Sequence, residues 1–259
     1  MINDPFHEKW GLDLSTYGDL SRKQEKSCYL NVRPSSEEAF PAELDDLIRL
    51  HYLATSRKMT TILEFGVGKS STVFDHALRV NKAAYSNFVS ENLRRSNSFE
   101  CHSVDNNQQW IEKCQKGAST ENVIYHFSKC GVYTFNDRIC TYFDPLPNIC
   151  PDLIYLDGPD QMSPTGNIRG LSTNHTDRLP MSADILAMEH FLLPGTLIVV
   201  DGRTANTRFL KSNLQRNWSY WYAVDFDQHF FELSESPLGI YNRRQIDFCL
   251  GDDFYERML

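Results

Sequence analysis

The residues with the clearest chemical potential form a short glycine-rich turn in the first third of the chain. Glu64, Gly66 and Gly68 are followed closely by Ser70 and Ser71. Glycines at this spacing let the backbone approach a ligand, and the helix predicted after them offers free N–H groups at its start. The turn therefore predicts a binding site for a nucleotide-like ligand.

Two known nucleotide-binding motifs match this turn only in part. The phosphate-binding loop of an NTPase requires a glycine five residues before Gly68, where the sequence has Leu63. A dinucleotide fingerprint requires a glycine at position 71, where the sequence has Ser71. The NTPase interpretation is disfavoured, and an NAD- or nucleotide-binding Rossmann protein, as a redox enzyme or a regulatory binding module, stays as the alternative function.

Acidic residues end three of the predicted strands. Asp105 ends the second strand, and Asp157 and Asp201 end the fourth and the fifth. Neighbouring strands lie about 4.8 Å apart, so Asp157 and Asp201 could converge on one hydroxyl group or one ion. They are candidate catalytic residues and candidate ligands of a metal such as Mg²⁺, which prefers oxygen. Asp105 and Asp201 could instead cap the helices that follow them.

A long segment, residues 158–180, follows Asp157 and is rich in Gly, Pro, Ser, Thr and Asn. Loops of this length are usually functional lids or disordered. His175 in this segment could take a proton from a substrate, and Arg169 and Arg178 could hold an anionic one. A solvated loop with incidental charges is the alternative interpretation.

Strands and helices must alternate to position these residues. Apolar runs predict strands that alternate with helices, and the strands are apolar on both faces, which indicates a parallel sheet covered on both sides. The aromatic residues 218–227 and 229–233 leave no room for a helix and predict an antiparallel hairpin. The expected strands are 61–65, 102–105, 123–127, 152–157 and 196–201, and the expected helices include about fifteen residues after Ser36, residues 72–78, 107–116 and 181–193.

The order of these motifs resembles the class I S-adenosylmethionine-dependent methyltransferases. The resemblance rests on E-x-G-x-G at the end of the first strand, on Asp105 and on Asp157, and it covers roughly residues 42–240. Residues 103–110, 156–159 and 200–202 are most similar to small-molecule and sugar O-methyltransferases. The resemblance implies a Rossmann-like three-layer α/β sandwich with a seven-stranded, mostly parallel sheet and an antiparallel C-terminal hairpin.

The resemblance also implies a cofactor and a reaction. The cofactor would be S-adenosylmethionine, and the methyl group would pass to a hydroxyl of a small molecule or sugar. Asp105 would accept the ribose hydroxyls, and Ser128 would lie where the family contacts adenine. Metal-dependent members resemble the Asp157 and Asp201 pair but follow the second acid with Asn, where this chain has Gly202. The implied cofactor-binding residues are Glu64, Gly66, Gly68, Ser70, Ser71, Asp105 and Ser128.

The composition of the chain limits the classes of partner that it is expected to bind. The formal net charge of −8 would repel a phosphate backbone, so no nucleic-acid partner is expected. No window is apolar enough for a membrane span, and the acidic N-terminus lacks a secretory signal, which favours a cytoplasmic protein without a membrane partner. The seven cysteines form no C-x-x-C pair and fit reduced thiols.

The expected domain organisation is simple. Residues 1–34 are polar and form an N-terminal extension, an arm that could mediate homodimer contacts. Residues 35–259 form a single methyltransferase-like domain with insertions at about 80–99 and 158–180.

Overall fold

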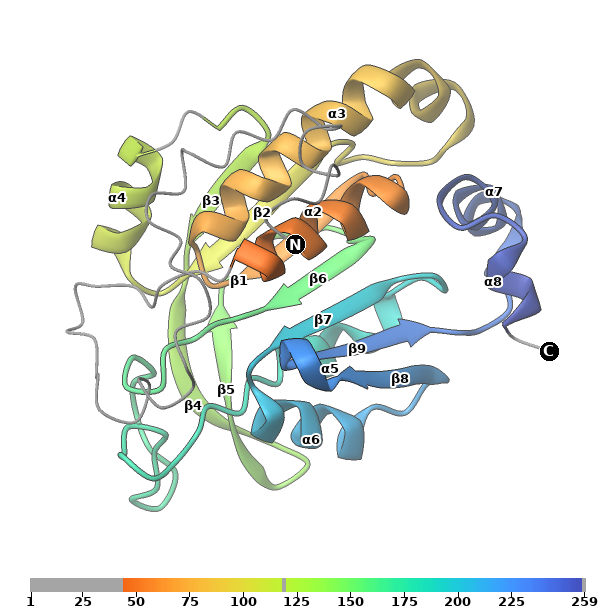
Figure 1. Cartoon of the computed structure of the whole chain (residues 1–259). Helices are drawn as coiled ribbons and strands as arrows, with labels where there is room; N and C mark the ends of the chain where they lie inside the picture. Colours follow the sequence, from red (N-terminus) through yellow and green to blue (C-terminus); the bar gives the residue numbers. More distant parts are fainter. Residues whose placement is uncertain (1–43, 118–119, 258–259) are drawn as a thin grey trace.

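The structure is a computed structural model that describes residues 44–117 and 120–257. Its centre is a seven-stranded sheet with the order β3-β2-β1-β6-β7-β9-β8 (Figure 1). Only β9 runs antiparallel to its neighbours β7 and β8, so the mostly parallel sheet and the C-terminal hairpin are confirmed. The N-terminal extension predicted for residues 1–34 lies outside the described residues. The strands are β1 (Thr61–Phe65), β2 (Glu100–Asp105), β3 (Val123–Phe127), β6 (Leu153–Leu156), β7 (Leu197–Asp201), β8 (Trp218–Ala223) and β9 (Gln228–Leu233).

Helices cover both faces of the sheet. Side chains alternate between the two faces of a strand, so Ile62 of β1 packs beneath the helices α2 (Leu44–Ser56) and α3 (Lys69–Asn92). Leu63 and Phe65 pack on the opposite face, under α5 (Asp184–Met188) and α6 (Thr204–Asn213). Figure 1 shows α2 and α3 lying across one side of the sheet. The result is the predicted three-layer α/β sandwich.

The chain changes direction across the sheet between β1 and β6. From β1 it passes to β2 and β3 on one side, and then returns to β6 and β7 on the other. Open α/β sheets bind ligands at such a switch point, outside the carboxyl ends of the strands. The topology therefore makes the turns that follow Phe65 and Leu156 the candidate ligand site.

A second sheet of two strands was not expected from the sequence. β4 (Lys129–Phe135) and β5 (Arg138–Asp144) form an antiparallel hairpin that packs with α5 on one face of the main sheet. Asn136 and Asp137 form its two-residue turn, and both have positive φ. Asn and Asp tolerate this conformation better than most residues, so this dipeptide was the available sequence signal.

Most of the segment expected as an insertion, residues 80–99, belongs to the helix α3. α3 continues without interruption to Asn92, and Val89 on its last turns is buried against Phe248. Phe248 belongs to α7 (Gly239–Cys249), which is followed by α8 (Asp253–Glu256). The long helix was missed because its partner helix lies about 150 residues later in the chain.

The other predicted elements differ mainly in length. The helix expected at 107–116 is α4 (Gln108–Gly117), and the one expected at 181–193 is only α5 with the 3₁₀ turn Glu189–Phe191. Within the described residues no helix has the length and apolar character needed to span a membrane. The six described cysteines are all free thiols, as predicted: Cys101, Cys114, Cys130, Cys140, Cys150 and Cys249.

Candidate functional site

The glycine turn after β1 meets the turn after β6 at the switch point. Gly66 has φ +99°, a conformation that L side chains rarely adopt. A Cβ on Gly66 would lie 3.0 Å from the carbonyl carbon of Asp157. Gly66 is therefore needed for the close contact between these two backbone segments.

Gly68 leaves open space where a ligand could approach. It precedes α3 as the N-cap residue, with an extended backbone, and a Cβ at this position would meet only the Ser70 Oγ at 3.9 Å. The first N–H groups of a helix have no partner within the helix, so the start of α3 offers hydrogen-bond donors beside this space. Gly68 and the first turn of α3 thus fit the amino-acid part of the proposed cofactor.

Glu64 is fully buried beneath this turn. Its carboxylate accepts hydrogen bonds from the hydroxyls of Ser70, Ser71 and Ser103. Burial raises the pKa of Glu64 to about 7, although the three hydroxyls oppose this rise. The structure brings Glu64, Ser70 and Ser71 together through hydrogen bonds with one another, and their contact with a cofactor stays a prediction.

Asp105 joins the glycine turn to the end of β2. Its carboxylate accepts the backbone N–H of Val67 at 3.0 Å and that of Asn107 at 2.8 Å. Burial raises the pKa of Asp105 against the effect of these hydrogen bonds. The helix α4 is capped by Asn107, whose Oδ1 accepts the N–H of Trp110 at 3.0 Å. Asp105 is therefore not the N-cap of that helix, and its carboxylate lies next to the turn that a ribose would have to approach.

Ser128 lies just after β3, as predicted, but its side chain is turned into the protein. It is fully buried and donates to the carbonyl oxygen of Pro145 at 2.6 Å. This bond ties the start of the unexpected hairpin to its end. A role for Ser128 at adenine stays a prediction.

Asp157 and Asp201 follow paired positions of neighbouring strands. Leu156 of β6 pairs with Val200 of β7 in parallel register, so the next residues of the two strands lie side by side. The side chain of Asp157 is 51% exposed and forms an ion pair with Arg203, in which Nε lies 3.6 Å from Oδ1. Arg203 also donates to the carbonyl oxygens of Asp157 and Pro159. The guanidinium therefore fixes the turn that carries Asp157.

Asp201 is held by different partners on the α2 and α3 side of the sheet. Tyr155 donates its hydroxyl to Asp201 Oδ2 at 2.6 Å, and Gln228 donates to Oδ1 at 3.3 Å. Arg49 of α2 in turn donates to Gln228 Oε1 at 2.9 Å. Of the two predicted carboxylates, Asp157 is the more accessible to a substrate. Asp201 is the more firmly oriented one.

The proposed metal site gains no support. Among the described residues, no group of three or more His, Cys, Asp and Glu side chains is arranged to hold a metal ion. Asp157 and Asp201 are engaged by an arginine and by a tyrosine with a glutamine, respectively.

The predicted lid at residues 158–180 is a long loop attached to the hairpin. Thr165 exchanges backbone hydrogen bonds of 2.9 Å with Cys130 and Val132 of β4, and Ser163 donates to Asn106 at 3.2 Å. The loop therefore lies beside Asp105 as well as after Asp157. His175 is half-exposed, and its Nδ1 accepts the N–H of Asp177 at 3.1 Å, which is a local turn contact. Its catalytic role stays a prediction.

Sequence reasoning did not assign roles to Arg203, Tyr155 or Gln228. Arg203 follows Asp201 by two residues, so its proximity was the only available signal. Tyr155 lies within the apolar run of β6 and resembles a core residue, and Gln228 lies on the returning strand β9. Their contacts depend on strand pairing, which a single sequence does not specify.

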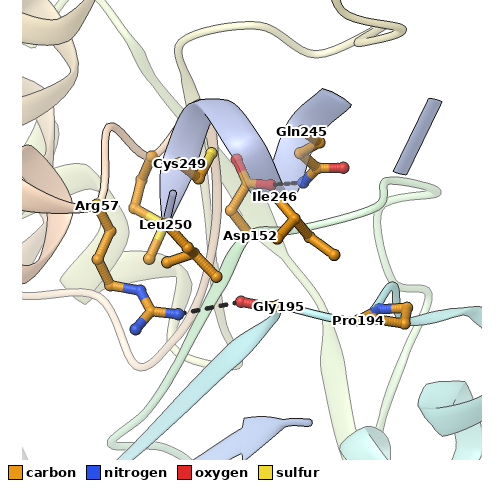
Figure 2. Close-up of a pocket in the computed structure, with 9 residues that line it drawn as sticks. Arg57, Asp152, Pro194, Gly195, Gln245, Ile246, Cys249 and Leu250 are labelled. Carbon is orange, nitrogen blue, oxygen red and sulfur yellow. Dashed lines mark hydrogen bonds between the residues drawn. The ribbon is translucent and has the colours of Figure 1, made fainter. Parts of the chain in front are cut away.

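A small cavity lies at the opposite edge of the sheet, where the parallel strands begin. Its volume of about 10 Å³ is suited to a single water molecule. Figure 2 shows Gln245 donating to Asp152, and Arg57 donating to the carbonyl oxygen of Gly195 at 3.2 Å. This cavity is too small for a nucleoside.

The order and directions of the strands and the glycine turn together define a Rossmann-like fold. This is the fold that the resemblance to class I methyltransferases implies. No protein-family model and no curated protein matches the chain. Solved structures similar to it include a putative O-methyltransferase from Klebsiella pneumoniae, with 12% identity, coverage of 89% of this chain and 90% of that one, and a TM-score of 0.41.

Two further structures are similar at the same level. The O-methyltransferase TomG from Streptomyces achromogenes, involved in tomaymycin synthesis and solved with SAM, is 14% identical, covers 88% and 86% of the two chains and has a TM-score of 0.39. The SAH-bound methyltransferase PaMTH1 from Podospora anserina is 12% identical, covers 90% and 89%, and has a TM-score of 0.38. Scores below 0.5 do not establish a ligand or a reaction, which must follow from the site itself.

Proposed function

We propose that this protein transfers a methyl group from S-adenosylmethionine to a hydroxyl of a small molecule or sugar. The observation that carries the proposal is the placement of three features along one edge of the sheet. The open glycine turn at Gly68 starts a helix, Asp105 ends the next strand on one side, and Asp157 ends the next strand on the other. A nucleoside with a charged amino-acid tail matches this sequence of donors and acceptors.

Two parts of the cofactor, its methionine carboxylate and its ribose, have residues suited to hold them. The helix start after Gly68 supports binding of the carboxylate of the methionine part, because the N–H groups at the start of a helix and the helix dipole favour an anion. The carboxylate of Asp105 supports binding of the ribose, because its two oxygens can accept from two neighbouring hydroxyls. The cofactor supplies an activated methyl group on its sulfonium.

The acceptor would bind on the side of Asp157. Methyl transfer is an in-line displacement, so alignment of the acceptor oxygen supplies most of the rate. The side chain of Asp157 is half-exposed, and desolvation raises its pKa to about 7, although the charge of Arg203 opposes this rise. A carboxylate with a pKa near neutrality can accept the proton of the acceptor hydroxyl as the oxygen attacks. Arg203 holds the Asp157 turn in place, and Asp201 keeps a second negative charge beside it.

Calorimetry tests the proposal directly. The full chain should bind S-adenosylmethionine and its demethylated product in the micromolar range, and should bind NAD and ATP at least 100-fold more weakly. Mass spectrometry of any ligand retained through purification gives an independent answer. Tight binding of NAD or ATP with no response to either methionine-derived ligand would replace methyl transfer with the dinucleotide-binding alternative.

A further inference from the structure

We propose that Glu64 acts as a positioning residue, whose carboxylate ties the start of α3 to β1 and β2 and so shapes the glycine turn without touching the ligand. The identity of that ligand rests on the proposed function. The proposal changes the role of Glu64 that the family resemblance implies, in which the side chain lies beside the cofactor itself.

The contacts of Glu64 form one continuous connection across three elements. Ser103 of β2 and Ser71 of α3 both donate to Oε2, and Ser70 of α3 donates to Oε1. The hydroxyl oxygen of Ser71 also accepts the backbone N–H of Gly68 at 3.3 Å. The second strand, the first strand, the helix start and the glycine turn are thereby linked through a single carboxylate.

The burial of this cluster argues against direct ligand contact. Glu64, Ser71 and Ser103 each have no exposed surface, whereas Ser70 keeps 8% of its surface. A buried carboxylate is costly unless several donors compensate it, and here both oxygens are engaged by neighbouring hydroxyls. A ligand could reach Oε1 or Oε2 only after these serines moved.

The glycine turn needs such a restraint. Glycine is free to adopt many backbone conformations, so a turn with Gly66 and Gly68 would sample many arrangements on its own. A binding site gains affinity when its groups are fixed before the ligand arrives. Three hydrogen bonds from the start of α3 and from β2 to one rigid carboxylate supply this restraint at the place where the N–H donors must point.

The test compares two substitutions with the same chemistry. Ser103→Ala removes one donor to Glu64, and Ser182→Ala removes the hydroxyl that donates to the buried carboxylate of Asp184 at 2.8 Å, under the other face of the sheet. Both variants should lower the melting temperature. Only Ser103→Ala should speed amide exchange at residues 67–71, by about tenfold, and weaken S-adenosylmethionine binding by about three- to tenfold.

The outcomes distinguish a failure of this proposal from a failure of the proposed function. If Glu64 contacted the cofactor directly, Ser103→Ala would free one of its carboxylate oxygens, and the affinity for S-adenosylmethionine would stay equal or increase. That result would overturn the proposal. Unchanged amide exchange at residues 67–71 would overturn it as well. If the wild-type chain binds no S-adenosylmethionine, the proposed function fails, but the exchange measurement still decides the role of Glu64. Should Ser103→Ala fail to fold, Ser71→Ala removes a donor from the helix side and gives the same comparison.

Discussion

Gly158 lies so close to Gly66 that a Cβ on Gly158 would be 2.8 Å from the Gly66 nitrogen and 3.0 Å from its Cα. The turn that carries the candidate ligand donors is thus in backbone contact with the turn that carries Asp157. The Asp157 N–H also donates to the Phe65 carbonyl at 2.9 Å, which fixes the same contact from the other side. Movement of either turn must therefore affect the other.

We expect Gly158→Ala to destabilise the protein by about 1–3 kcal/mol, because its new methyl group meets backbone that cannot move aside as a side chain would. Gly68→Ala is the matched control: it adds the same methyl group two residues beyond Gly66 but into open space. Urea unfolding should show a much smaller loss for Gly68→Ala, and calorimetry should show weaker S-adenosylmethionine binding in that variant. Equal stability losses would mean that the contact of the two turns can relax.

We expect Asp105→Ala to weaken S-adenosylmethionine binding by about 1.5–3 kcal/mol, since it removes a charged acceptor from the expected ribose position and from the Val67 N–H. Asp105→Asn keeps one oxygen acceptor, and the loss of affinity should be smaller. Calorimetry on both variants measures the effect. A fall in melting temperature without a change in affinity would place the ribose partner elsewhere.

We expect Asp157→Asn to reduce methyl transfer by about 100-fold or more once an acceptor is known, because the amide cannot accept the hydroxyl proton. Cofactor affinity should change little. A chelator should leave turnover unchanged, since Asp157 forms an ion pair with Arg203 and needs no metal ion as a partner. Initial rates with and without EDTA test both statements, and loss of activity with the chelator would restore the metal hypothesis.

Asp184 makes stability depend on pH in a defined direction. Burial raises its pKa to about 7, whereas its unfolded value lies near 4. The folded state therefore binds more protons between these values, and the stability contributed by the protonated group is lost as pH rises toward 7. Asp184→Asn keeps an acceptor for the Phe143 N–H, which donates to Oδ1 at 2.9 Å.

We therefore expect the stability of Asp184→Asn relative to the wild type to increase between pH 5 and pH 8, by about 2.5 kcal/mol. Glu64 has a similarly raised pKa and adds to the slope of both proteins, so the difference between them isolates Asp184. Urea unfolding at both pH values measures it. Parallel pH profiles for the two proteins would show that Asp184 is charged in the folded state.

The sequence alone determined the main sheet and the edge that carries the site. Apolar runs followed by glycine or aspartate predicted β1, β6 and β7, because a strand buried on both faces needs continuous apolar residues and its end needs polar ones. The strands β2 and β3 were predicted as well, although β3 is followed by Ser128. The aromatic residues likewise predicted the hairpin of β8 and β9. Glu64, Gly68, Asp105, Asp157 and Asp201 became candidate site residues in this way, since residues near the ends of parallel strands share one edge of the sheet.

Only the tertiary structure decided what each of these residues contacts. Glu64 meets Ser103 from a strand 39 residues away, and Asp201 meets Tyr155 and Gln228 from two neighbouring strands. The helix that continues to Asn92 and the hairpin after Ser128 depend likewise on packing against distant partners. Periodicity in a sequence reports which side of an element is buried, whereas hydrogen-bond partners are set by strand order and register, which arise only when the chain folds.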